Sequence, residues 1–173
     1  MENDALSVFL TEFKKQVIYR LELNPPRIQT CLNNLNETEV WDRPNDSSNS
    51  IGNLILHLSG NITQYIISGL GGVTDNRNRD SEFSINSRFP KAELEHKILH
   101  TVNESVRVIN KLSSEQLIQK YSIQGYEITG IAALIHVTEH FSYHTGQIVC
   151  LTKALKNIDT GFFKGLDLNK NNK

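Results

Sequence analysis

The sequence has little cysteine and almost no net charge. Its 173 residues include two cysteines, Cys31 and Cys150, which are too few for a disulfide scaffold and lack a partner at a metal-ligand spacing such as Cys-x-x-Cys. We therefore interpret both as small core residues rather than catalytic ones. A formal net charge of -1 provides no basic field, so nucleic acid is not an expected partner.

Long apolar runs are also missing. No stretch of about 18 or more apolar residues could span a bilayer, and the first residues are not a basic segment followed by an apolar one. We therefore expect a cytoplasmic protein with no membrane partner. The 38% of hydrophobic residues suit one domain with a sizeable core. We expect that domain to cover residues 1–165, followed by a polar, disordered tail over residues 166–173.

What the sequence does contain is helical periodicity. Apolar residues at three- and four-residue steps predict four long helical segments, near residues 4–35, 51–70, 90–112 and 129–155. Pro25 and Pro26 should bend or interrupt the first segment, whose apolar face begins at Leu6 and Phe9. Alternation around Gly125 permits a small hairpin before the last helix. With almost no other strand signal, the predicted fold class is all-α, a four-helix bundle.

Two histidines in the last predicted helix are candidate metal ligands. His140 and His144 are four residues apart, so an α-helix stacks them on one face. Their stripe is otherwise apolar and includes Val137, Tyr143 and Ile148, so we expect it to point inward. Histidines on an apolar face are more often hydrogen-bonded core residues than ligands, and the pattern alone leaves that alternative open.

A stable site needs a third ligand from a facing helix. His57 is the only histidine in the second predicted helix, which makes His57, His140 and His144 the expected trio. Three neutral nitrogens leave a coordination position open for hydroxide, a thiolate or a carboxylate, and an open site indicates chemistry. Imidazole ligation suits zinc, nickel, iron or copper, of which we expect zinc or nickel. By contrast, His96 and His100 lie on a polar face and are interpreted as solvated.

Other residues are expected near this trio. One group shares the helical face of His57 or lies beside the last two histidines, where it could support the ligands or orient a small-molecule substrate; the alternative is a solvated edge. That group is Asn53, Asn61, Gln64, Tyr143 and Gln147. His136 lies one turn before His140 and is expected to support the ligands, although a ligand or a core histidine is also compatible with its position. The long polar loop around Arg77 and Arg79 could be a lid but is expected to be solvated.

Three segments carry a resemblance to a known family. They are Trp41-x-Arg43-Pro44, the run Ser50-Ile51-Gly52-Asn53-Leu54-Ile55-Leu56-His57-Leu58, and the run from His136 to Ile148 with its closing His-x-x-x-His-Thr-Gly-Gln. Together they resemble the DinB-like family of damage-inducible and thiol-transferase proteins over nearly the whole chain. Thr145 stands where many members have arginine.

The resemblance implies a four-helix bundle, often a homodimer, that holds a divalent metal through positions matching His57, His140 and His144. Family members of similar fold include bacillithiol S-transferases and mycothiol-dependent maleylpyruvate isomerases. The function expected from it is therefore metal-dependent transfer of a low-molecular-weight thiol, such as bacillithiol, to an electrophilic substrate. The alternatives are a metal-dependent hydrolase or isomerase and a non-enzymatic, metal-binding stress protein.

Overall fold

The protein is described by a computed structural model that covers residues 2–84 and 88–171. The first predicted segment forms two helices, α1 (Glu2–Glu22) and α2 (Asn24–Asn33). Pro25 and Pro26 lie in the first turn of α2, where an N–H donor is not needed, so the prolines separate the helices as predicted. A short 3-10 helix, η1 (Glu39–Trp41), follows.

The second predicted helix has two parts. It begins as α3 (Ile51–Ile62), which Ser50 and Asn53 cap reciprocally, each side chain accepting a bond from the backbone of the other. It continues as a π-helical segment, η2 (Thr63–Leu70). Such wider turns are rare and frequently occur at functional sites. A loop then leads to the short helix α4 (Arg79–Glu82).

The rest of the fold also follows the predicted order. Helix α5 (Lys91–Lys111) is followed by the short α6 (Ser114–Ile118) and the hairpin of β1 (Lys120–Ile123) and β2 (Tyr126–Thr129). Gln124 and Gly125 form its turn with φ of 53° and 80°, the left-handed conformations that a tight hairpin requires. The chain then enters the longest helix, α7 (Gly130–Lys156).

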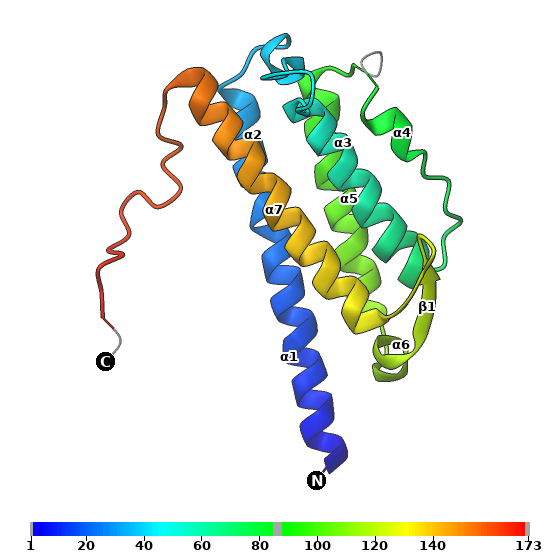
Figure 1. Ribbon diagram of the computed structural model, residues 1–173. Coiled ribbons are helices and arrows are strands. Elements are labelled where there is room, and N and C mark those ends of the chain that lie inside the picture. The colour runs from blue at the N-terminus through cyan, green and yellow to red at the C-terminus, as the bar shows by residue number, and fades with distance from the viewer. Residues whose placement is uncertain (1, 85–87, 172–173) are drawn as a thin grey trace.

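The long helices pack around one apolar core (Figure 1). The α1–α2 pair, α3 with η2, α5 and α7 each contribute fully or nearly fully buried side chains. Examples are Leu21, Ile28, Ile55, Leu58, Ile66, Leu94, Ile98, Val137, Phe141 and Ile148. The predicted all-α four-helix bundle of DinB-like type, with its small hairpin, is confirmed.

Three apolar residues depart from the expected burial. Leu6 and Phe9 are 52% and 62% exposed, because the N-terminal half of α1 extends beyond the other long helices (Figure 1). Cys150 is exposed, so its interpretation as a core residue was wrong, whereas Cys31 is buried as expected. Periodicity shows that a helix has an apolar face but does not show how far its neighbours extend.

The structure bears on two further expectations, the absence of a membrane span and the polar tail after residue 165. Within the described ranges, no helix is long and apolar enough to cross a membrane. Leu166 and Leu168 are exposed, and residues 172–173 of the expected tail lie outside the described residues. The domain boundary at residue 165 and the disordered tail stay predictions.

Candidate metal centre

Helices α3 and α7 bring three imidazole rings together at one point. Nε2 of His57, on α3, lies 2.9 Å from Nε2 of His140, on α7. The ring centroids of His57 and His144 are 5.1 Å apart, and those of His140 and His144 are 4.4 Å apart. One potential ligand atom from each ring lies within 4.8 Å of the other two. Ligand nitrogens about 2 Å from a shared ion would have comparable separations, so the three residues could hold a metal.

Burial keeps the two rings of α7 in the neutral form that a metal requires. The pKa of His140 is lowered to about 3, mainly by burial and in addition by the neighbouring charges of His144 and His57. Burial also lowers the pKa of His144, against a smaller opposing effect of its hydrogen bond to Gln147. Neutral imidazole has a free lone pair, so near neutral pH both rings are available as donors without first losing a proton.

Neighbouring side chains determine which nitrogen of His57 and which nitrogen of His144 is free. Nδ1 of His57 lies 2.9 Å from Oε2 of Glu82 and, in a longer contact, 3.2 Å from Nη2 of Arg77, which donates to the same carboxylate oxygen at 2.9 Å. A carboxylate only accepts hydrogen bonds, so Nδ1–H donates and the lone pair is on Nε2, the atom that faces His140. Nδ1 of His144 lies 2.7 Å from Oε1 of Gln147, which leaves Nε2 of that ring free in the same way.

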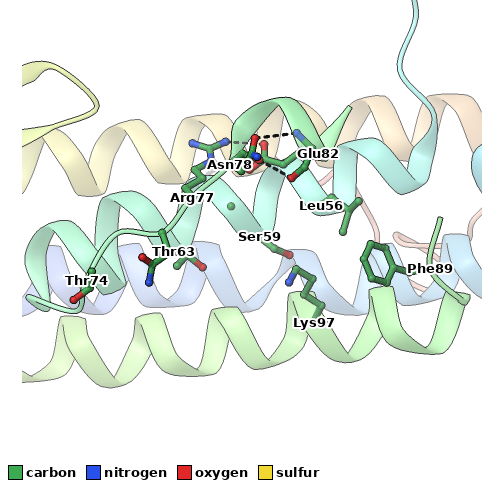
Figure 2. A pocket seen from close by; sticks show the side chains of 12 residues that line it. Leu56, Ser59, Thr63, Thr74, Arg77, Asn78, Glu82, Phe89 and Lys97 are labelled. Carbon is green, nitrogen blue, oxygen red and sulfur yellow. Dashed lines mark hydrogen bonds and ion pairs between the residues drawn. The ribbon is translucent and has the colours of Figure 1, made fainter. Parts of the chain in front are cut away.

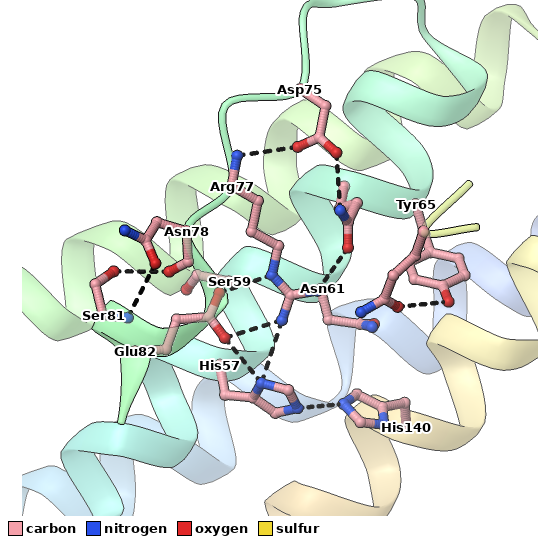
Figure 3. Close-up of polar contacts among 12 residues, drawn as sticks. His57, Ser59, Asn61, Tyr65, Asp75, Arg77, Asn78, Ser81, Glu82 and His140 are labelled. Atoms are coloured by element: carbon pink, nitrogen blue, oxygen red, sulfur yellow. Dashed lines mark hydrogen bonds and ion pairs between the residues drawn. The ribbon is translucent and has the colours of Figure 1, made fainter. Parts of the chain in front are cut away.

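Arg77 is the partner of Glu82. Its Nε and Nη2 atoms donate to the two carboxylate oxygens of Glu82 at 2.7 and 2.9 Å, and its side chain is only 4% exposed (Figure 3). Burial alone would raise the pKa of Glu82, but hydrogen bonds from Arg77 and His57 outweigh it and hold that pKa below its usual range. The neighbouring residues 74–76 and 78–80 are exposed, as expected for a solvated loop, but the side chain of Arg77 is not.

The model of a family described as a protein of unknown function (DUF1572) matches residues 8–172, nearly the whole chain. The chain belongs to this DinB-like family. None of the curated proteins matches it.

Two solved structures show the DinB-like fold. The DinB-like protein YjoA from Bacillus subtilis is 17% identical, with a TM-score of 0.63 over 83% of this chain and 94% of that one. A DinB-like protein from Bacillus cereus is 15% identical, with a TM-score of 0.63 over 83% of this chain and 90% of that one. At these identities the likeness establishes the fold alone.

Of the other residues predicted near the centre of this DinB-like chain, two lie directly beside the rings. Gln147 contacts His144, as described above. The ring of His136 lies 5.4 Å from that of His140, in a stacked orientation, and its Nε2 is 3.3 Å from Nδ2 of Asn61. Oδ1 of Asn61 is buried and has no hydrogen-bond partner among the described residues.

Tyr143, Asn53 and Gln64 lie farther out. The Tyr143 ring is 5.0 Å from His144, but the side chain is 63% exposed, so its expected place on the inward stripe was wrong. Nδ2 of Asn53 donates to the backbone oxygen of Glu82. Gln64 instead accepts a bond from Nη1 of Arg77 at 2.8 Å. Both therefore support the loop that carries Glu82.

A cavity borders the same loop. Its volume is about 520 Å³, and its lining includes Ser59, Phe89 and Lys97 together with Arg77 and Glu82 (Figure 2). None of the three clustered histidines lines it. The cavity therefore reaches Arg77 and Glu82, the partners of His57, but not the histidines themselves.

Glu82 and Arg77 contact His57, and the sequence did not predict either contact. They lie 25 and 20 positions after His57, in a polar loop with no regular spacing to it. The only available signal was the length of that loop, which is typical of functional or disordered segments. His96 and His100, the rejected pair, are exposed as expected, although their rings stack 6.1 Å apart.

Proposed function

We propose that the protein binds one divalent metal ion through Nε2 of His57, His140 and His144. The observation that carries this proposal is the convergence of the three rings, with ligand atoms within 4.8 Å of one another. Two further features support it. First, the imidazole donors on α7 are neutral. Second, Glu82 and Gln147 each contact Nδ1 of their histidine, which leaves Nε2 of His57 and of His144 free.

The donor set also supports a choice of ion and an activity. Three neutral imidazoles suit zinc or nickel and leave at least one position for another molecule. When bound, such an ion lowers the pKa of a thiol or water that reaches it, which supplies a nucleophile near neutral pH. We propose that the protein is an enzyme whose nucleophile is a low-molecular-weight thiol of the bacillithiol type.

In the proposed reaction, the thiol sulfur forms a bond to an electrophilic carbon of the second substrate. The leaving group departs with the electron pair of the bond that breaks, and the thiol proton passes to solvent. Asn61 and His136 lie one helical turn from His57 and His140 and would orient a substrate there. Oδ1 of Asn61 supports this role, because a buried acceptor without a protein partner is available to a ligand N–H or O–H.

The first experiment measures metal content. The purified protein should bind one zinc or nickel ion per chain, by elemental analysis and by titration of the metal-free form. His144→Ala should lose this stoichiometric binding, while His96→Ala should retain it, because His96 is exposed and outside the cluster. Full metal retention by His144→Ala would refute the site.

The second experiment tests the reaction. The metal-loaded protein is mixed with bacillithiol or glutathione and a chlorinated aromatic acceptor, and loss of free thiol is followed. Turnover of an acceptor without any thiol would favour a hydrolase or isomerase. Metal binding with no turnover in either assay would favour a non-enzymatic metal-binding protein.

We also propose that the protein is a homodimer in the cytoplasm. Exposed Leu6, Val8 and Phe9 on α1, which continue toward an apolar groove between α1 and α7 that includes Phe13 and Ile135, support a second copy as the cover. Light scattering coupled to gel filtration tests the dimer: Phe9→Glu should shift a dimer to a monomer. An unchanged mass for that variant would contradict this interface.

A further inference from the structure

We propose that Glu82 is a positioning residue for His57 and that Arg77 and Gly60 hold it in place. The inference rests on the metal site proposed above and extends it to a loop that contributes no ligand. In this arrangement residues 75–83 deliver a buried carboxylate to the outer nitrogen of one ligand. Outer partners of this kind orient metal-binding histidines and fix which nitrogen is free.

The contact between His57 and Glu82 is buried and directional. Both side chains are 8% exposed, and Nδ1 lies 2.9 Å from Oε2. This bond fixes the ring about its χ2 torsion, and Nε2, on the opposite edge, then faces His140 (Figure 3). Without Glu82 the ring could rotate or carry its proton on Nε2, and either change would remove a donor from the centre.

Arg77 offsets the unfavourable free energy of burying the Glu82 carboxylate. An unpaired buried charge is strongly unfavourable, and the two-pronged contact of Arg77 with Glu82 supplies the opposite charge and two donors. Arg77 is itself aimed by a chain of bonds: its Nη1 donates to Gln64, the Gln64 amide donates to Asp75, and Asp75 accepts from the backbone N–H of Arg77. These three hydrogen bonds hold the guanidinium of Arg77 in one orientation.

The backbone beyond Glu82 is anchored independently. Nδ2 of Asn53 donates to the backbone oxygen of Glu82, and Nη2 of Arg43 donates to Oδ1 of Asn53 and to the backbone oxygen of Phe83. Asn53 also caps α3, the helix that carries His57. The capped end of α3 and the part of the loop that carries the Glu82 carboxylate are therefore fixed to each other.

Gly60, on α3, leaves room for Glu82 and Arg77 beside the helix. A Cβ atom at residue 60 would lie 2.0 Å from Oε1 of Glu82 and 2.9 Å from Nε of Arg77. Glycine in a helix interior is otherwise unfavourable compared with alanine. Its absent side chain is what lets Glu82 and Arg77 pack directly on the helix, one turn from His57.

The test compares three substitutions with matched controls. Glu82→Ala removes the acceptor, Glu82→Gln keeps a neutral one, and Gly60→Ala displaces the carboxylate without changing it. Asp80→Asn is the control for Glu82, because Asp80 is an exposed acid on the same short helix. Gly146→Ala is the control for Gly60, because a Cβ there, inside α7, meets nothing within 4 Å.

Zinc affinity is measured by competition with a chelator. Glu82→Ala and Gly60→Ala should weaken it by about 10- to 100-fold, the usual effect of losing an outer partner, and Glu82→Gln should be weakened less. Both controls should bind as wild type does. Wild-type zinc affinity in Glu82→Ala and Gly60→Ala would overturn the inference.

Nitrogen NMR of the metal-free protein separates this inference from the proposed function. His57 should show a protonated Nδ1 and a bare Nε2 in the wild type, and a mixture of the two forms in folded Glu82→Ala. If the chemical-shift dispersion of Glu82→Ala matches that of the wild type, the variant is folded, and the mixture of tautomers is not caused by unfolding. If the wild type binds no metal, the proposed function fails, and the same spectra still decide whether Glu82 positions His57.

Discussion

Nε2 of His57 and Nε2 of His140 lie 2.9 Å apart although 83 positions separate the two residues in the chain. Two imidazole nitrogens at this distance share one hydrogen or one metal ion, because two N–H groups would point their hydrogens at each other. Adding a second proton to His140 is unfavourable: burial first, and then the charges of His144 and His57, lower the pKa of His140 to about 3.

The stability of the metal-free protein should therefore depend on pH. The unfolded chain protonates His140 near its usual pKa of 6.5, but the folded protein does so only near about 3. Between these values the unfolded state binds more protons, so stability should fall as pH decreases from about 6.5 toward 3. Urea midpoints between pH 7 and pH 4 measure this slope. His140→Asn should show a shallower slope, and an equal slope in that variant would contradict the role of His140.

The histidine trio and the bundle could be predicted because both depend on local spacing. Helical periodicity identified the four segments, and the four-residue step placed His140 and His144 on one face. His57 was found because a bundle brings facing helices together. Each of these inferences uses positions within a helix or the packing of whole helices, which the sequence pattern encodes directly.

The loop could not be predicted, because its contacts depend on the folded shape of the chain. Nothing in the run Asn76-Arg77-Asn78-Arg79 distinguishes buried Arg77 from exposed Arg79, and Glu82 has no spacing rule that relates it to His57. The predicted burial of Tyr143 was wrong for a different reason. It lies at the edge of the apolar arc of α7, where neighbouring helices no longer cover it.

The two cysteines should differ in reactivity. Cys150 is exposed, while burial of Cys31 raises the pKa of its thiol and shields it. In the native protein one thiol per chain should react with a disulfide reagent within minutes, and the second only in denaturant. Cys150→Ser should abolish the fast phase. A fast phase that persists in this variant would show that Cys31 is accessible.

Gly52 should be sensitive to a single added methyl group. A Cβ atom there would lie 2.7 Å from the ring of Trp41, the only tryptophan, whose Nε1 donates to the backbone oxygen of Phe89. Gly52→Ala should therefore force the indole outward, with a cost of about 1–3 kcal/mol in unfolding free energy. Tryptophan fluorescence should shift to longer wavelength. Gly146→Ala, in open space, should be neutral or slightly stabilising, and equal effects of the two substitutions would contradict this explanation.

Asn61 offers a test of substrate orientation that leaves the ligands untouched. Its Oδ1 is buried without a partner in the described part of the chain, and its Nδ2 makes a long contact of 3.3 Å with His136, so Asn61→Leu should change thermal stability little and should retain the metal. If Oδ1 accepts a hydrogen bond from a substrate, the variant should raise KM for the thiol or its acceptor by about three- to tenfold, the value of one neutral hydrogen bond. Steady-state kinetics with each substrate varied in turn identifies which one is held. Unchanged KM values for both substrates would mean that the unpaired oxygen serves no substrate.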